Sequence, residues 1–182
     1  CPESDVIAGY LEQGSVLERI LAFLEWFFYV KADRILLVSP GFQKRLAERG
    51  YAPAKLRTVL LGADGSLFRD INPDTDFRPK HGLGDATLAV YTGAHGIANG
   101  LDYVLQAAEL LRNRNDIIFV LIGDGNRKSQ LIDAAREKNL TNIRFIDPVP
   151  KTQLPAILMT CNIGLMILRD VGERPVTPNK IF

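Results

Sequence analysis

The sequence predicts an α/β protein whose C-terminal part forms a doubly wound parallel sheet. Short continuous apolar runs, typical of strands buried on both faces, alternate with segments in which apolar residues recur at helical spacing. The alternation runs from residue 87 to residue 168. Right-handed crossovers between such strands place helices on both faces of the sheet. We expect the strand order 3-2-1-4 or a close variant.

The individual elements follow from these runs and from local punctuation. In the C-terminal part we expect strands at 87–91, 117–122, 143–146 and 163–168, and helices at 98–112, 127–138 and 153–160. Upstream we expect a helix at 12–29 and strands at 34–38 and 57–61. A further helix should start at Pro40, after the N-cap Ser39, and end at Gly50.

A change of composition separates the two parts of the chain. The stretch from Leu61 to Gly84 contains several Gly, Pro and Asp residues and no apolar period, as interdomain linkers do. The sequence therefore predicts three segments: the end of one domain at 1–64, a linker at 65–84, and a second, incomplete domain at 85–182. The absence of an initial Met and the helix-like start at Lys180 suggest a piece of a longer protein.

Composition excludes several classes of function. The formal net charge of +1 gives no basic field for nucleic acid, so no nucleic-acid partner is expected. The two cysteines do not make a disulfide framework, which favours a reducing cytoplasm. His81 and His95 stand outside any metal-ligand spacing, so we expect no metal and no cofactor.

The apolar stretch from Ile20 to Val30 is interrupted by Glu25 and is too short to cross a bilayer. We expect its helix to be buried against neighbouring strands in the intact protein. The aromatic run from Trp26 to Tyr29 leaves an alternative, a peripheral contact at the inner face of the membrane.

Three loops follow the carboxyl ends of predicted strands, where open parallel sheets bind ligands. The first, from Thr92 to Gly96, combines two glycines with a helix start, an arrangement that suits a phosphate but also a simple tight turn. The second, from Gly123 to Arg127, lacks the third glycine of a dinucleotide fingerprint. Arg127 and the following Lys128 could meet a diphosphate or be solvated charges in the first turn of a surface helix. The third, residues 169–179, contains Glu173, which could orient sugar hydroxyls or be an ordinary exposed carboxylate.

Several segments together resemble the group 1 glycosyltransferases, the retaining family (family four) with the GT-B fold. The segments that carry the resemblance are ADRILLVSPGFQKRLAERG, VLLGADGSLF, YTGAHGIANGLDYVLQAAELL, FVLIGDGNRKSQLIDAARE with NIRFIDPVPKTQLPAIL, and VTPNKIF. The start, CPES before a long helix, is similar to a segment of the branch that acts in surface polysaccharide assembly. Some positions depart from the family pattern: Asn99 stands where a phosphate-binding lysine is common, and Asp147 stands in place of a common glycine.

The resemblance implies two Rossmann-like domains, with residues 1–64 as the end of the N-terminal, acceptor-binding one and residues 85–182 in the one that binds a nucleoside diphosphate sugar. It implies transfer of a sugar, of hexosyl or N-acetylhexosaminyl type, to a carbohydrate or lipid-linked acceptor in bacterial polysaccharide or glycolipid synthesis. The chain alone is expected to be inactive. We assign Glu173 as catalytic and expect the donor to be bound by Gly93, His95, Gly96, Gly123, Arg127, Asn179 and Lys180.

Two alternatives stay open at this point. One is a sugar-nucleotide epimerase of the same overall fold, whose catalytic acids and base would lie mostly outside this chain. The other is a nucleotide-binding or interaction module without catalysis. The order of the motifs favours the transferase over the epimerase.

Overall fold

A computed structural model describes residues 11–60, 62 and 65–169 of the chain. These residues fall into two compact units, one up to residue 62 and the other from residue 65 to residue 169.

The first unit is small and contains a two-stranded parallel sheet. Its elements are α2 (Val16–Lys31), β1 (Ile35–Leu37), α3 (Pro40–Glu48), the 3-10 turn η1 (Pro53–Lys55) and β2 (Leu56–Thr58). The N-cap prediction is confirmed, because the Ser39 hydroxyl accepts a hydrogen bond from the N–H of Phe42 at 3.3 Å. Between the sheet and α3 lies a core of four buried residues, Ile35, Leu37, Leu46 and Leu56.

Helix α2 begins at Val16, after the N-cap Ser15, rather than at Glu12 as the sequence suggested; the Ser15 hydroxyl accepts a hydrogen bond from the N–H of Glu18. None of the residues of α2 is buried within the described part of the chain. The expected burial of this helix against neighbouring strands is therefore not observed there. Tyr29 alone packs toward the small core, edge-on to the ring of Tyr51. No helix in the described ranges is both long and apolar enough to cross a membrane.

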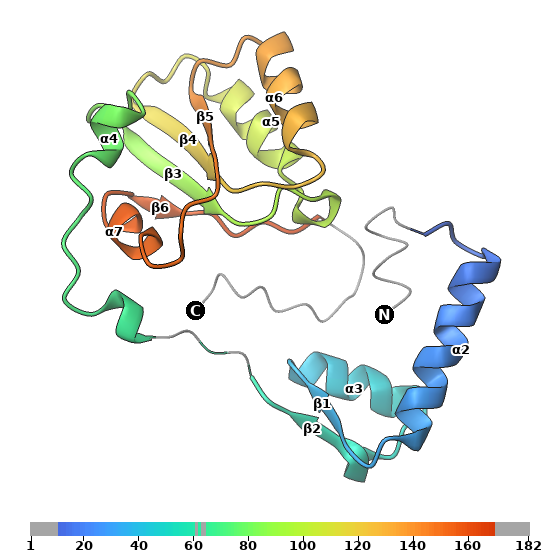
Figure 1. The fold of residues 1–182 in the computed structure, drawn as a ribbon. Helices are drawn as coiled ribbons and strands as arrows, with labels where there is room; N and C mark the ends of the chain where they lie inside the picture. Colours follow the sequence, from blue (N-terminus) through green and yellow to red (C-terminus); the bar gives the residue numbers. More distant parts are fainter. Residues whose placement is uncertain (1–10, 61, 63–64, 170–182) are drawn as a thin grey trace. The chain divides into compact units, whose positions relative to one another are not determined.

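The second unit is built around the doubly wound sheet (Figure 1). Its strands are β3 (Thr87–Thr92), β4 (Ile117–Ile122), β5 (Ile143–Ile146) and β6 (Ile163–Gly164), all parallel and in the order β5-β4-β3-β6. Its helices are α4 (Phe77–Lys80), α5 (Asp102–Leu110), α6 (Lys128–Glu137) and α7 (Leu154–Leu158), with 3-10 turns η2 (Gly65–Phe68) and η3 (Ile97–Asn99). Numbered along the chain, this order is 3-2-1-4, as predicted.

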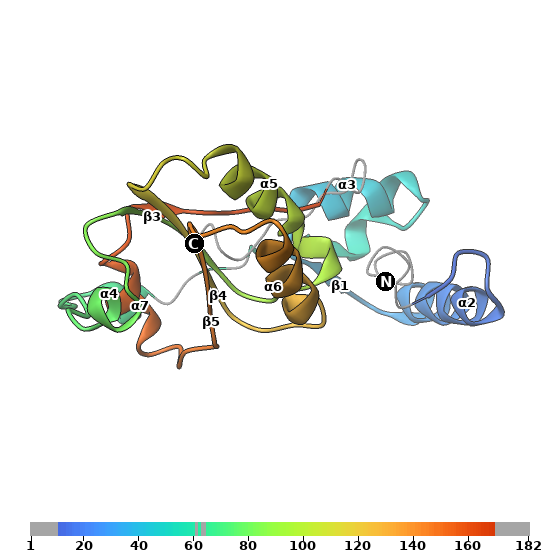
Figure 2. The same cartoon turned by 90° about the horizontal axis from the view of Figure 1, so that it is seen from above.

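Both faces of this sheet are buried along β3, β4 and β5, because different residues of each of these strands point into different cores. Ala89 and Tyr91 of β3 pack under α5 and α6, whereas Leu88 and Val90 pack toward α4 and α7. The helix pairs lie on opposite sides of the strands in both views (Figures 1 and 2). Such two-sided burial explains why the strands are continuous apolar runs in the sequence.

The expected linker at 65–84 is wrong in its second half. Phe77 and Leu83 are almost completely buried in the core on the α4 side. The Arg78 guanidinium donates to the carbonyls of Ala86 (2.9 Å) and Thr160 (2.8 Å), and so ties this segment to the start of β3 and to the chain before β6. Residues 77–84 are therefore part of the second unit.

Several elements are shorter than predicted, and two of them lie near the carboxyl end of β3. The helix expected at 98–112 begins as η3, and α5 proper starts only at Asp102, because Gly100 adopts φ +62° and interrupts the helix. The strand expected at 163–168 pairs with β3 only through Ile163 and Gly164. Both corrections leave the carboxyl ends of β3 and β4, and the loops that follow them, where the sequence placed them.

Candidate functional site

The carboxyl ends of β3 and β4 lie side by side, with Thr92 paired to Ile122. The loops that follow, residues 93–96 and 123–127, therefore start at the same edge of the sheet. This edge is where open parallel sheets bind ligands, because the strand ends and helix starts there leave backbone groups free to contact them.

The two loops are joined by hydrogen bonds that extend the strand pairing. The bonds run from the N–H of Gly93 to the carbonyl of Ile122 (2.9 Å), from the N–H of His95 to the carbonyl of Asp124 (2.7 Å), and from the N–H of Arg127 to the carbonyl of His95 (3.0 Å). The loops thus form one connected layer at the end of the sheet.

Glycine is required where these loops touch. A Cβ atom on Gly123, whose φ is +145°, would lie 2.0 Å from the carbonyl oxygen of Gly93. A Cβ atom on Gly125 would lie 2.6 Å from the carbonyl oxygen of His95. Because a backbone cannot yield as a flexible side chain can, any larger residue at position 123 would separate the loops.

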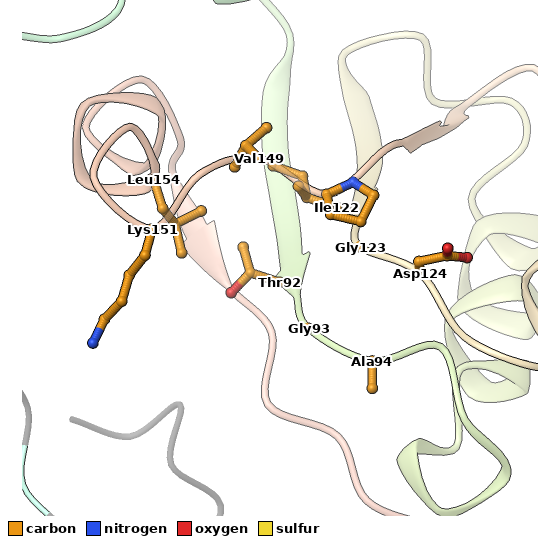
Figure 3. Close-up of a pocket in the computed structure, with 10 residues that line it drawn as sticks. Thr92, Gly93, Ala94, Ile122, Gly123, Asp124, Val149, Lys151 and Leu154 are labelled. Carbon is orange, nitrogen blue, oxygen red and sulfur yellow. The ribbon is translucent and has the colours of Figure 1, made fainter.

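A pocket of about 490 Å³ opens beside this layer. It is lined by Thr92, Gly93, Ala94, Ile122, Gly123, Asp124, Pro148, Val149, Lys151 and Leu154. In Figure 3 Lys151 and Leu154 lie on one side of the end of β3, and Gly123 and Asp124 lie on the other. The volume falls within the range of small-molecule sites.

The lining combines an apolar wall with a polar turn. Val149 and Leu154 supply apolar surface next to the sheet, and the exposed Lys151 supplies a cation at the margin (Figure 3). Across from them, the N–H of Ala94 has no hydrogen-bond acceptor among the described residues. A flat apolar group and an anion could be bound at the same time by such a pocket.

The side chain of His95, expected among the donor-binding residues, does not line this pocket. Its ring is completely buried, with ring centroids 6.1 Å from Tyr91 and 6.3 Å from Phe145. Neither ring nitrogen has a hydrogen-bond partner within the described part of the chain. Burial, and then the nearby Lys128 ammonium, lower the pKa of His95. His95 therefore contributes to the site through its backbone, as a neutral core residue.

Arg127 also lies outside the 490 Å³ pocket. Its guanidinium forms an ion pair with Asp102 at 3.0 Å. Both side chains line a separate depression of about 260 Å³ at the start of α5, together with Gly100, Tyr103, Gln106 and Arg169. Because the Arg127 guanidinium already pairs with a carboxylate, it is less available to bind a diphosphate.

The other predicted site residues divide into two groups. Gly93 and Gly123 line the pocket, whereas Gly96 lies beyond its lining, at the start of η3. The residues expected to orient the sugar and to meet the phosphates from the third loop, Glu173, Asn179 and Lys180, lie outside the described residues. Over the ranges that are described, His, Cys, Asp and Glu form no cluster that could hold a metal ion.

The wall formed by residues 148–154 was not predicted from the sequence. These residues follow β5, and their approach to β3 depends on the strand order, which no local pattern encodes. The available signal was Pro148 and Pro150 directly after a buried strand, since prolines there favour an extended loop instead of an immediate helix.

The family of the chain follows from its sequence. Residues 73–169, more than half of the chain, match the family described as Glycosyl transferases group 1. The chain belongs to the group 1 glycosyl transferases. The matched range covers β3 to β6 and therefore the whole described pocket.

Two curated relatives resemble nearly the entire chain. WcaI of Escherichia coli K12, named as a colanic acid biosynthesis glycosyl transferase, is 25% identical over 178 residues, which are 96% of this chain and 43% of WcaI. WbjE of Pseudomonas aeruginosa, named as a glycosyltransferase, is 25% identical over 182 residues, which are 100% of this chain and 45% of WbjE. The chain spans less than half of the length of either relative.

Solved structures show the same fold. The crystal structure of HepE from Anabaena in complex with UDP-glucose matches 84% of this chain and 42% of HepE, with a TM-score of 0.67 and 15% sequence identity. At this identity the likeness concerns the arrangement of strands and helices. It confirms the GT-B type of architecture that the sequence predicted.

Proposed function

We propose that the intact protein transfers a sugar from a nucleoside diphosphate sugar to a carbohydrate or lipid-linked acceptor, with retention of configuration, in bacterial polysaccharide or glycolipid synthesis. Family membership and the names of WcaI and WbjE support the transferase activity. The complex of HepE with UDP-glucose supports a nucleotide-sugar donor. The first unit would belong to the acceptor-binding domain, and the second unit would bind the donor.

The 490 Å³ pocket is the observation that carries this proposal. The nucleobase would lie against the apolar wall of Val149 and Leu154, where a flat ring loses contact with water. The diphosphate would reach the turn at Gly93 and Ala94, because the backbone is exposed there and the Ala94 N–H lacks an acceptor among the described residues. Lys151 would add positive charge at the pocket margin.

The difficult step of sugar transfer is the departure of the diphosphate, and this arrangement would lower the barrier to that step. Negative charge grows on the leaving phosphate in the transition state, and fixed donors that point at it lower the barrier. The Ala94 N–H is one such donor, and we assign a similar role to Lys180, with Glu173 orienting the sugar. The acceptor hydroxyl would be delivered by the other domain.

Binding of nucleoside diphosphates tests the donor site directly. We expect calorimetry with uridine, guanosine and adenosine diphosphates to show binding of at least one of them, with a dissociation constant in the micromolar range or weaker, about −8 kcal/mol. Ala94→Glu should weaken this binding at least about tenfold, because the exposed Ala94 lines the pocket where the anion would lie.

Ala98→Glu is the matched control. Ala98 is also exposed and only four residues away, but it is not among the lining residues of the pocket. Its variant should bind the nucleotide as the unmodified chain does. Equal losses in both variants would place the diphosphate elsewhere, and no binding by the unmodified chain would count against the proposed donor.

A further inference from the structure

The pocket is bordered by the loops that follow β3, β4 and β5. Each loop begins one residue after the last paired residue of its strand. Strands β4 and β5 pair as far as Ile122 and Ile146, and Gly123 and Asp147 are the next residues of each. Gly123 is also in backbone contact with Gly93 of the first loop. The loop after β5 continues into Pro148 and Val149, which form the apolar wall.

One side chain connects the loops that follow β4 and β5. The Lys128 ammonium, at the first position of α6, donates to the carbonyl oxygen of Gly123 at 2.9 Å and to the carboxylate of Asp147 at 2.6 Å. The Lys128 side chain is 13% exposed, whereas that of Asp147 is 93% exposed. A largely buried cation thus holds an exposed loop to the end of a central strand.

Lys128 does not itself line the pocket. Two of its three donors are taken by Gly123 and Asp147, so its ammonium is directed to the protein and not to a ligand. Its hydrogen bond also keeps the Asp147 carboxylate charged and lowers the pKa of that carboxyl.

The ion pair contributes little to the overall stability of the unit, because one partner is almost fully exposed to water. Its effect is local instead. Val149 packs partly against the core on the α4 side, and the Lys128 bridge fixes the other end of the same short segment at Asp147. With both ends held, the wall is in place before a ligand arrives, and less conformational entropy is lost on binding.

We propose that Lys128 is a positioning residue that clamps the loop after β5 to Gly123 and thereby pre-forms the apolar wall of the nucleotide pocket. Its effect on a ligand rests on the proposed function. Its effect on the loop does not, because the hydrogen bonds are made by the chain itself. The clamp therefore has two readouts, one with nucleotide and one without.

The ligand-free readout is backbone nitrogen relaxation measured by NMR, which gives order parameters. Lys128→Met should lower the order parameters of Asp147 and Val149, since the loop would no longer be fixed at Asp147, and leave that of Val90 in β3 unchanged. Lys138→Met, which removes an exposed lysine of the same helical segment that pairs with Glu109, is the matched control and should change neither. Unaltered order parameters at Asp147 and Val149 in Lys128→Met would overturn the clamp.

The ligand readout compares uridine diphosphate with uridine, which lacks the phosphates. A clamp that shapes the apolar wall predicts that Lys128→Met weakens the binding of both about tenfold. Lys128→Arg, which can still donate to both partners, should restore most of the affinity. A loss for the diphosphate alone would show that Lys128 acts through its charge on the phosphates, and would overturn the proposal.

Asp147→Asn separates the two roles by the sign of its effect. The clamp predicts about threefold weaker uridine diphosphate binding with Lys128 present, and no further loss in the Lys128→Met background. A charge role predicts tighter binding, because the variant removes a carboxylate and frees the ammonium. If the unmodified chain binds none of the three nucleoside diphosphates, the proposed function fails, and the order parameters at Asp147 and Val149 still decide for or against the clamp.

Discussion

The two units of the chain differ in how many apolar residues they bury. In the second unit the sheet separates two cores, which contain eleven and nine buried residues. In the first unit a parallel pair of strands and one helix enclose four buried residues. Helix α2 of that unit buries none, and Phe23, Trp26 and Phe28 are each more than half exposed. A parallel sheet normally has both faces covered, as in the second unit.

The difference shows what a binding site at the end of a sheet needs. The backbone contacts between the loops at Gly93 and Gly123 hold only if β3 and β4 are fixed, and both strands are buried on both faces. The second unit therefore contains the packing that its pocket requires. The first unit lacks such a two-sided core within its described residues, so its contribution to function depends on further packing.

The largest expected effect is a separation of the two units in urea. Trp26 is the single tryptophan of the sequence and reports on the first unit, whereas far-UV circular dichroism reports mainly on the helices and strands of both. We expect Trp26 fluorescence to change at a lower urea concentration than the main part of the dichroism, because four buried residues stabilise less than twenty. Coincident transitions would show that the units stabilise each other.

A substitution within the sheet should act on the second unit alone. Leu121 of β4 is completely buried between α5 and α6, so Leu121→Ala should lower the free energy of unfolding of this unit by about 2–5 kcal/mol. Leu110→Ala removes the same atoms from a side chain that is 85% exposed, and should cost less than about 0.5 kcal/mol. Urea titration followed by dichroism measures both. The Trp26 transition should not move in either variant.

The buried ring of His95 predicts a pH dependence of the second unit. Its pKa is lowered in the folded chain, chiefly by burial, so the unfolded chain takes up the proton first as the pH falls below about 6.5. The stability that neutral His95 allows is therefore fully present above that pH and is lost as the pH falls toward the folded pKa. Urea titrations between pH 7 and pH 5 should show this decline.

The variant His95→Phe should flatten that decline, because it keeps an aromatic ring in the core and removes the group that titrates. His81, the other histidine, also has a pKa lowered by burial, so His81→Phe is needed to separate the two contributions. An unchanged pH profile in His95→Phe would mean that the ring is not held neutral by its surroundings.

The fold of the second unit could be predicted because its information is local. Each strand is a continuous apolar run, and in each helix apolar residues recur at helical spacing. The right-handed crossover rule then leaves few possible orders of the strands in the sheet. The predicted linker failed for the opposite reason. Phe77 and Leu83 are isolated apolar residues among Gly and Pro, and the carbonyl of Thr160 that Arg78 contacts is 82 residues away in the sequence.

Some residues of the candidate site could likewise be predicted from local sequence, whereas the roles of others depend on contacts distant in the sequence. Gly93 and Gly123 were predicted from turns that directly follow strands. The role of Lys128 depends on β5 lying next to β4, so its partner Asp147, 19 residues later, could be recognised as unusual but not as its partner. His95 and Arg127 looked equally polar in the sequence, and only packing shows that the first is buried and that the second is paired with Asp102.

The smallest expected effect concerns Arg127 and marks the boundary of the pocket. Its ion pair with Asp102 is partly exposed, so Arg127→Gln should lower the free energy of unfolding of the second unit by only about 0.5–1 kcal/mol. Because Arg127 lines the separate 260 Å³ depression, the dissociation constant for uridine diphosphate should change less than about twofold. The loss of nucleotide affinity in Ala94→Glu, measured in the same calorimetric series, is the reference for a substitution inside the pocket. A loss of similar size in Arg127→Gln would return Arg127 to the donor site, as the sequence first suggested, and would mean that the pocket and the depression act as one site.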